Sequence, residues 1–122
     1  MIYHVRIVKP AQTDMREIYR YIADDLQNPA AAERRISLID EKILELETMP
    51  MRHPLVSDVY LASKGFRMVS AKTHLVFFVI REGLPNEPKC VLVMRILYCR
   101  RDWARILKHD IVQVGKLDTY EY

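Results

Sequence analysis

The sequence contains few of the patterns that mark specialised classes of protein. Only three glycines and two cysteines occur among its 122 residues. No apolar run approaches the ~20 residues that a membrane-spanning helix needs. The segment 1–10 alternates in character and contains His4, Arg6 and Lys9, which is unlike a signal peptide or a membrane anchor. We therefore expect a cytoplasmic protein with no membrane partner.

Motifs for metal binding, phosphate binding and nucleophilic catalysis are absent as well. Cys90 and Cys99 fall at the two ends of one predicted strand, and nine extended residues at ~3.3 Å each exceed the reach of a disulfide. We expect both cysteines to be reduced, and no metal-ligand spacing occurs. The sequence has neither a Gly-rich phosphate loop nor a Ser/His/Asp arrangement. We therefore expect no metal and no cofactor.

The charges are divided unevenly along the chain, although the net charge is only +3. Residues 10–48 carry five basic and nine acidic side chains, a net charge of −4. Residues 49–109 carry eleven basic and four acidic side chains, a net charge of +7. A polyanion would be attracted to the second half.

The hydrophobic pattern of the first half predicts a short strand and a helical hairpin. Residues 2–8 alternate as a strand, and Pro10 suits the first turn of a helix. Asn28 and Pro29 suit the N-cap and first position of a second helix, which Met49–Pro50 closes. Both helices carry an apolar stripe, and almost no loop joins them, so they must form an antiparallel pair. The stripes are Ala11, Met15, Ile18, Ile22 and Leu26, then Ala32, Ile36, Ile39, Ile43 and Leu46.

The second half changes to the two-residue period of strands. The predicted strand segments are 58–61, 65–70, 75–81 and 90–98. Short connections make the last three strands antiparallel neighbours. Asp102 suits the N-cap of a short C-terminal helix. We expect a two-layer α+β domain over residues 1–109, and a tail of unassigned structure over residues 110–122.

An arginine interrupts the last predicted strand. Buried cations are unfavourable unless they have a partner or a task. Because side chains alternate, the simplest sheet turns Leu92, Met94 and Ile96 toward the helices and places Arg67 and Arg95 on an opposite, open face. The alternative for Arg95 is an ion pair with an acid from elsewhere in the chain. Further candidates for the rim of the open face are Lys72, His74, Arg81, Arg100 and Arg101.

Arginines without a protein nucleophile suit one reaction in particular. RNA can be cleaved by attack of its own 2′-hydroxyl on the adjacent phosphate, and the protein then orients groups, stabilises charge and moves protons. Arginines stabilise the charge, whereas proton transfer would fall to Tyr98, His74 or Lys72. Regular alternation points Tyr98 at the core, and only a bulge or strand end at Leu97 would turn it toward Arg95.

Six segments, over about Val5 to Leu107, carry a resemblance to a known family. In the helices they are Asp14-x-x-Glu17-Ile18-x-x-Tyr21-Ile22, Asn28-Pro29-x-Ala31-Ala32-x-Arg34 and Leu46-x-x-Met49-Pro50. In the strands they are Gly65-Phe66-Arg67, Leu75-Val76-Phe77-Phe78 and Val93-Met94-Arg95-Ile96-Leu97-Tyr98-Cys99-Arg100-Arg101-Asp102. Their order and spacing resemble the RelE/ParE superfamily of toxins from bacterial toxin–antitoxin systems. The resemblance implies the same hairpin-on-sheet fold and a co-expressed antitoxin that wraps around the toxin.

The superfamily implies two different activities. RelE-like members enter the ribosome and cleave mRNA, whereas ParE-like members poison DNA gyrase and need no nuclease residues. The nuclease pattern makes Arg67, Arg95 and Tyr98 the candidate catalytic residues. The candidate substrate-binding residues are Lys72, His74, Arg100 and Arg101. Many relatives have histidine at the position of Tyr98, and the basic pair at 100 and 101 is common to both activities.

The leading hypothesis is a toxin that is a ribosome-dependent mRNA endonuclease, with the ribosome, mRNA and an antitoxin as partners. The alternative is a ParE-like inhibitor of DNA gyrase that acts by protein binding. A third possibility is a degenerate toxin that only binds its partner.

Overall fold

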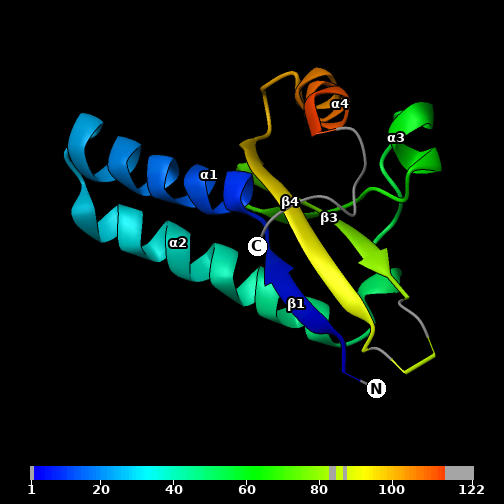
Figure 1. Ribbon diagram of the computed structural model, residues 1–122. Coiled ribbons are helices and arrows are strands. Elements are labelled where there is room, and N and C mark those ends of the chain that lie inside the picture. The colour runs from blue at the N-terminus through cyan, green and yellow to red at the C-terminus, as the bar shows by residue number, and fades with distance from the viewer. Residues whose placement is uncertain (1, 83–84, 87, 115–122) are drawn as a thin grey trace.

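The computed structural model describes residues 2–82, 85–86 and 88–114, which form an α+β fold (Figure 1). Within these residues one sheet has the strand order β1-β4-β3-β2. The strands are β1 (His4–Ile7), β2 (Arg67–Ala71), β3 (His74–Arg81) and β4 (Cys90–Tyr98). β4 pairs antiparallel with β3, and β3 pairs antiparallel with β2, which confirms the predicted order of the last three strands. β1 pairs parallel with β4 and forms one edge of the sheet.

The predicted helical hairpin is confirmed. It consists of α1 (Lys9–Arg20), which continues through a π-helical turn (Tyr21–Asp25), and α2 (Pro29–Leu44), which ends in a short 3-10 turn (Glu45–Glu47). Most of the apolar stripe residues face the sheet, and from them Ala11, Ala32, Ile39 and Leu46 are completely buried, whereas Leu26 near the tip of the hairpin is exposed. The hairpin therefore supplies one layer and the sheet the other, as the period of the apolar residues predicts.

Side-chain caps begin the later helices. The Asn28 side chain accepts a hydrogen bond of 3.1 Å from the Ala31 N–H at the start of α2, as predicted. The segment predicted as a strand from residue 58 is instead α3 (Val59–Ser63), where the Asp58 side chain accepts from the Leu61 N–H at 3.0 Å. An aspartate three residues before a free N–H favours a helix start over a strand, so the strand prediction for 58–61 was wrong.

The C-terminal helix is longer than the sequence predicts. α4 (Trp103–Val114) begins after Asp102, whose side chain accepts from the Arg105 N–H at 3.3 Å. The helix therefore continues through the first five residues of the segment 110–122, for which no structure was predicted. Residues 115–122 lie outside the described residues.

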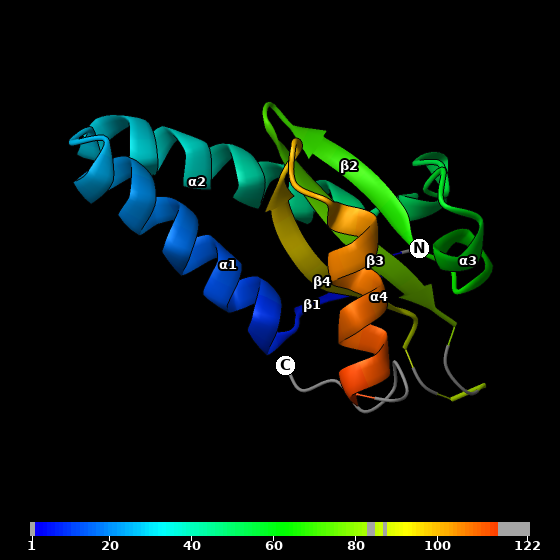
Figure 2. The ribbon, with the colours of Figure 1, turned by 90° about the horizontal axis from the view of Figure 1, so that it is seen from above.

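The sheet face opposite the hairpin is covered by α4, which Figure 2 places across β3 and β4 on the side away from α2. The Trp103 and Phe77 rings lie 5.1 Å apart between centroids, and Leu107 and Ile111 are buried in the core. The expectation of an open face was wrong for this part of the sheet. Both faces carry apolar side chains, so both need a cover.

A β-bulge in β4 changes the predicted assignment of faces. The register pairs Phe77 with Arg95 but Phe78 with Val93, so Met94 is the extra residue. Phe77 and Phe78 are neighbours on β3 and point to opposite faces. Arg67 pairs with Phe78 across the other edge of β3. The two arginines that were predicted to share a face therefore lie on opposite faces of the sheet.

Candidate functional site

Arg95 lies between two carboxylates that come from the two sides of the sheet. Its Nε and Nη2 donate to Asp14 on α1 at 2.7 and 2.9 Å, and its Nη1 donates to Asp110 on α4 at 2.9 Å. The first pair is bidentate, which is the strongest geometry for a guanidinium and a carboxylate. The alternative prediction for Arg95, an ion pair with a distant acid, is the one that the contacts support.

Asp14 also completes the edge of the sheet. β1 pairs with β4 only as far as Val93, so β4 has no strand neighbour on that side beyond this point. There the Ile96 N–H donates to Asp14 Oδ2 at 2.9 Å. Asp14 is 6% exposed, and its carboxylate satisfies both a backbone donor and a cation. This aspartate was missed as a structural residue, because its partners are more than eighty positions away in the sequence.

The ion pairs decide the protonation state of Arg95. Burial alone disfavours its charged form, but hydrogen bonds and charge from Asp14, and then from Asp110, outweigh burial and raise the pKa of Arg95. Its three guanidinium nitrogens all donate to carboxylates. A phosphate would have to displace a buried carboxylate to reach this arginine.

Arg67 belongs to a different part of the molecule. Its Nη1 donates to the backbone oxygens of His53 at 2.6 Å and Met51 at 3.3 Å, so it fixes the loop that precedes α3. The His53 ring in turn contacts Phe78 edge-on, with centroids 6.0 Å apart. Arg67 therefore has a structural set of contacts that does not include Arg95 or Tyr98.

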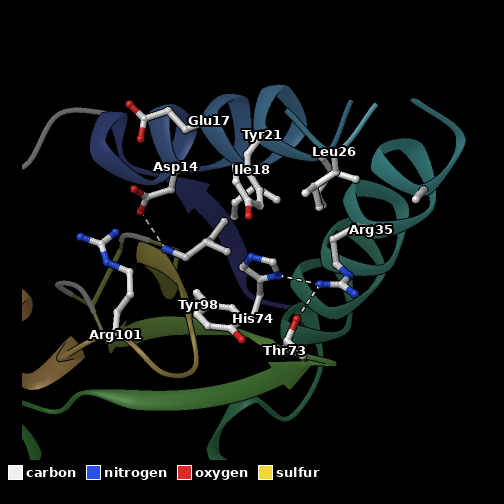
Figure 3. Close-up of a pocket in the computed structure, with 13 residues that line it drawn as sticks. Asp14, Glu17, Ile18, Tyr21, Leu26, Arg35, Thr73, His74, Tyr98 and Arg101 are labelled. Atoms are coloured by element: carbon white, nitrogen blue, oxygen red, sulfur yellow. Dashed lines mark hydrogen bonds between the residues drawn. The ribbon is translucent and has the colours of Figure 1, made fainter. Parts of the chain in front are cut away.

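A groove of about 800 Å³ lies between the hairpin and one end of the sheet (Figure 3). One wall comes from the first helix, its π-helical turn and the start of α2, and it is mainly apolar but includes the carboxylates of Asp14 and Glu17. The other wall is polar and comes from β3, β4 and the turns that adjoin them. Its lining includes Ile18, Leu26, Arg35, His74, Tyr98 and Arg101. We call this space the hairpin groove.

His74 lies in the hairpin groove with its tautomer fixed by geometry. Arg35 Nη1 is 2.8 Å from His74 Nδ1 and 2.8 Å from Thr73 Oγ1. Because a guanidinium can only donate, Nδ1 must be the unprotonated nitrogen, and Nε2 carries the hydrogen. Burial, and then the charge of Arg35, lower the pKa of His74 to about 4. His74 is therefore neutral at pH 7, and its Nε2–H is a donor.

Tyr98 is in the hairpin groove rather than beside Arg95. It pairs with His74 across β3 and β4, and the two rings meet edge-on with centroids 5.9 Å apart. No bulge occurs at Leu97, where one was required to turn Tyr98 toward Arg95. The bulge of this strand lies at Met94, before Arg95. With two residues between Arg95 and Tyr98 after the bulge, the two side chains point to opposite faces. Tyr98 is 41% exposed.

The predicted substrate-binding residues gather near one end of the sheet. Lys72 lies in the β2–β3 turn with a φ of 57°. The Cys99 N–H donates to the Thr73 oxygen at 2.8 Å, which holds the segment after β4 against this turn. Arg100 and Arg101 are exposed in that segment, and Arg101 lines the hairpin groove beside His74 and Tyr98. Arg35, from the acidic half of the chain, was missed.

The three predicted catalytic side chains do not form one site. Arg95 lies on the α4 face, whereas Arg67 and Tyr98 lie on the hairpin face. Arg67 pairs with Phe78 and Tyr98 with His74, four residues apart along β3, a separation of about 13 Å along the strand. What converges instead is a neutral histidine, a tyrosine and two arginines beside an apolar wall.

The described residues contain no group of three or more His, Cys, Asp or Glu side chains that could hold a metal ion. None of the helices in the described part of the chain is long and apolar enough to span a membrane.

Comparisons with known proteins agree with one another. The sequence model of one family, described as the ParE toxin of the type II toxin–antitoxin system parDE, matches residues 5–103. A chain of a solved structure, the chromosomal ParDE toxin–antitoxin system from P. aeruginosa, has a similar fold with a TM-score of 0.61. It is 16% identical, and the alignment covers 80% of this chain and 96% of that chain. No curated protein sequence matches the chain.

Proposed function

The chain belongs to the ParE toxin family of type II toxin–antitoxin systems, within the RelE/ParE superfamily, and from this premise we propose that it inhibits DNA gyrase by binding it. It is the toxin of a toxin–antitoxin module, and its partner in the module is an antitoxin. The proposed target is the one that the ParE-like branch implies. The proposed location is the cytoplasm, where gyrase acts. In this view toxicity requires a binding surface and no bond-breaking chemistry.

The arrangement of Arg95 is the observation that carries the proposal. A nuclease arginine must present donors to the charge that develops on phosphate. Arg95 instead gives all three nitrogens to Asp14 and Asp110, and it lies on the face opposite Tyr98. The residue that the nuclease hypothesis needs most is thus engaged in holding two helices to β4.

The groups available for proton transfer are also poorly suited to a nuclease. His74 Nδ1 accepts from Arg35, and the low pKa of His74 makes it a donor rather than a base at neutral pH. The Tyr98 ring contacts His74, and no acid or amine among the described residues forms a hydrogen bond with the Tyr98 hydroxyl. Neither predicted group is therefore set up as a general base for the 2′-hydroxyl, and of the two carboxylates that line the hairpin groove, Asp14 and Glu17, Asp14 is engaged by Arg95 and the Ile96 N–H.

The hairpin groove supports binding to a protein more directly. Tyr21 and Leu26 line it and are 54% and 55% exposed, and Ile18 and Ile22 extend the apolar wall. Exposed aromatic and aliphatic side chains next to arginines are typical of the central part of a protein–protein interface. The π-helical turn supports this proposal, since such turns are frequent at functional sites.

Cleavage of mRNA is the competing function, and one observation favours it. His74, Tyr98 and Arg101, three of the seven residues predicted for substrate contact or catalysis, line the same groove. An RNA could contact these side chains there. The two functions differ in what purified toxin does to purified targets.

The test compares the purified toxin in two assays. We expect it to inhibit supercoiling of relaxed plasmid by purified gyrase, and to leave a ribosome-programmed mRNA uncut when the ends are mapped. Addition of the antitoxin should restore supercoiling. Cut mRNA together with normal supercoiling would overturn the proposal and establish the nuclease function.

A further inference from the structure

Five cations lie around one end of the sheet, and we call them the cationic end. They come from α2, the β2–β3 turn and the segment after β4, namely Arg34, Arg35, Lys72, Arg100 and Arg101. Backbone and side-chain hydrogen bonds at Thr73 join these segments: its oxygen accepts from the Cys99 N–H, and its hydroxyl accepts from Arg35. The cluster is therefore held together by the fold.

The cationic end borders two grooves. Arg35 and Arg101 line the hairpin groove. Arg34, Arg35 and Lys72 line a second groove of about 710 Å³ along α2. Arg35 thus connects the two, and Figure 3 shows its guanidinium beside His74 and Thr73. An extended anion that follows this end could contact both grooves at once.

The cations of this cluster lie close together and have no acidic partner within the described residues. In the part of the chain that the structure describes, none of the five lies within the 4.0 Å that defines an ion pair with a carboxylate. Glu33 and Glu41 line the second groove, but they form no ion pair there either. Arg35 uses only Nη1 in its contacts with Thr73 and His74, so its other nitrogens remain available.

Two neutral groups next to the cations add directional donors. The Nε2–H of His74 has no hydrogen-bond partner within the described residues, and His74 lies in the hairpin groove. Tyr98 places a half-exposed ring and hydroxyl beside it. Cations, an imidazole N–H and a hydroxyl are the groups that position a protein on a phosphate backbone.

We infer that the cationic end binds the phosphate backbone of duplex DNA, so that the toxin contacts the DNA of its target complex as well as the protein. The inference rests on the proposed function, because gyrase holds duplex DNA. A duplex is favoured over a single strand because Tyr98 is the one exposed aromatic beside the cations in the described residues, with Tyr21 on the opposite wall of the groove, whereas single-strand sites stack several bases on several rings. Arg and Lys contacts to phosphate carry no sequence preference.

Binding should be weak and strongly dependent on salt. With about four phosphate contacts, affinity should fall about 100-fold between roughly 50 and 200 mM salt, because counterions are released from the duplex. A fluorescent duplex of about 20 base pairs in an anisotropy titration with the full chain measures this directly. The slope of log affinity against log salt concentration reports the number of phosphate contacts.

Two double variants with the same change in charge make the test specific. Lys72→Ala with Arg101→Ala removes two members of the cationic end. Arg16→Ala with Arg20→Ala removes two exposed arginines of α1 that line neither groove. We expect the first variant to bind the duplex about tenfold more weakly, with a slope of log affinity against log salt concentration that is smaller by about two. The affinity of the second variant should change by less than about twofold. Circular dichroism should show both folded.

The outcomes separate this inference from the proposed gyrase function. Equal weakening in both variants, or no binding of the duplex at low salt, would overturn the inference. An RNA hairpin of matched length that binds more tightly than the duplex would also overturn it. Binding to gyrase without DNA is measured in parallel: the first variant should still bind the protein but inhibit supercoiling less. If wild-type toxin does not bind gyrase while the duplex titration behaves as expected, the proposed function fails and the DNA site stands.

Discussion

The surroundings of Arg95 and the cationic end contain the same kind of side chain in opposite circumstances. Arg95 is largely but not completely buried, and it contacts two carboxylates. Arg101 is exposed, and no carboxylate of the described residues pairs with it. Both were predicted as functional residues from their position in a basic stretch of sequence. What separates them is the presence of an acid from a distant segment.

The contrast indicates how to distinguish a structural arginine from a binding one. A buried guanidinium requires compensation, and the chain supplies it with Asp14 and Asp110. An exposed guanidinium is hydrated and can exchange water for phosphate at small cost. Substitutions should therefore affect stability at the first location and binding at the second.

The largest expected effect on stability follows from Arg95→Met. The substitution keeps the apolar contacts of the side chain but leaves the buried Asp14 and the Asp110 carboxylate without a cation. We expect the free energy of unfolding to fall by about 3–5 kcal/mol, as when one partner of a buried ion pair is removed. Urea denaturation followed by circular dichroism measures it.

Arg95→Lys serves as the control for charge. An ammonium keeps the charge but cannot make the bidentate contact, so the loss should be smaller. If Arg95→Met left stability within about 1 kcal/mol of wild type while abolishing toxicity, Arg95 would be a functional residue and the contrast would fail.

A smaller effect should distinguish the two carboxylates. Asp14→Asn can still accept from the Ile96 N–H but loses the ion pair, and we expect a loss of about 2–3 kcal/mol. Asp110→Asn removes the charge from a less buried group on α4 that accepts one hydrogen bond from Arg95, and we expect about 1 kcal/mol. The comparison uses the same urea titration. An equal loss in both variants would contradict the view that the edge of β4 depends on Asp14.

The sequence predicted the local elements well because their signals are local. The apolar stripes predicted both helices of the hairpin, and the cap at Asn28 occurs as expected. The capping aspartate at Asp58 was present in the sequence too, but the segment after it was interpreted as a strand. A capping residue followed by a free N–H is a signal that could have corrected this prediction.

The arrangement of the site could not be predicted because it depends on register. The bulge at Met94 leaves no signature in the sequence, yet it decides which side of the sheet Arg95 and Tyr98 occupy. The contact between Arg35 and His74 joins positions 39 apart, so no spacing rule indicates it. Residue types in the basic half were identified, but the choice among them required the fold.

The pH dependence of stability tests the polar side of the hairpin groove. The unfolded chain binds a proton at His74 near pH 6.5, whereas the folded chain does so only near pH 4. Between these values the unfolded state holds more protons, so stability falls as pH falls, by an amount of the order of 2 kcal/mol after allowance for solvent at the groove. In the His74→Gln variant the urea midpoint should depend less on pH between these two values. An unchanged slope would mean that burial and the charge of Arg35 do not hold His74 neutral over this range.

The smallest effect on stability should come from Arg101→Ala, and it makes the contrast with Arg95 complete. The side chain is exposed and forms no ion pair within the described residues, so we expect the urea midpoint to be unchanged within error. Toxicity on induction should nevertheless fall, because the side chain lies at the junction of the hairpin groove and the cationic end. Arg101→Lys keeps the charge and should retain part of the wild-type toxicity. A clear loss of stability in Arg101→Ala would show that this arginine is structural, and the separation between compensated and uncompensated arginines would no longer hold.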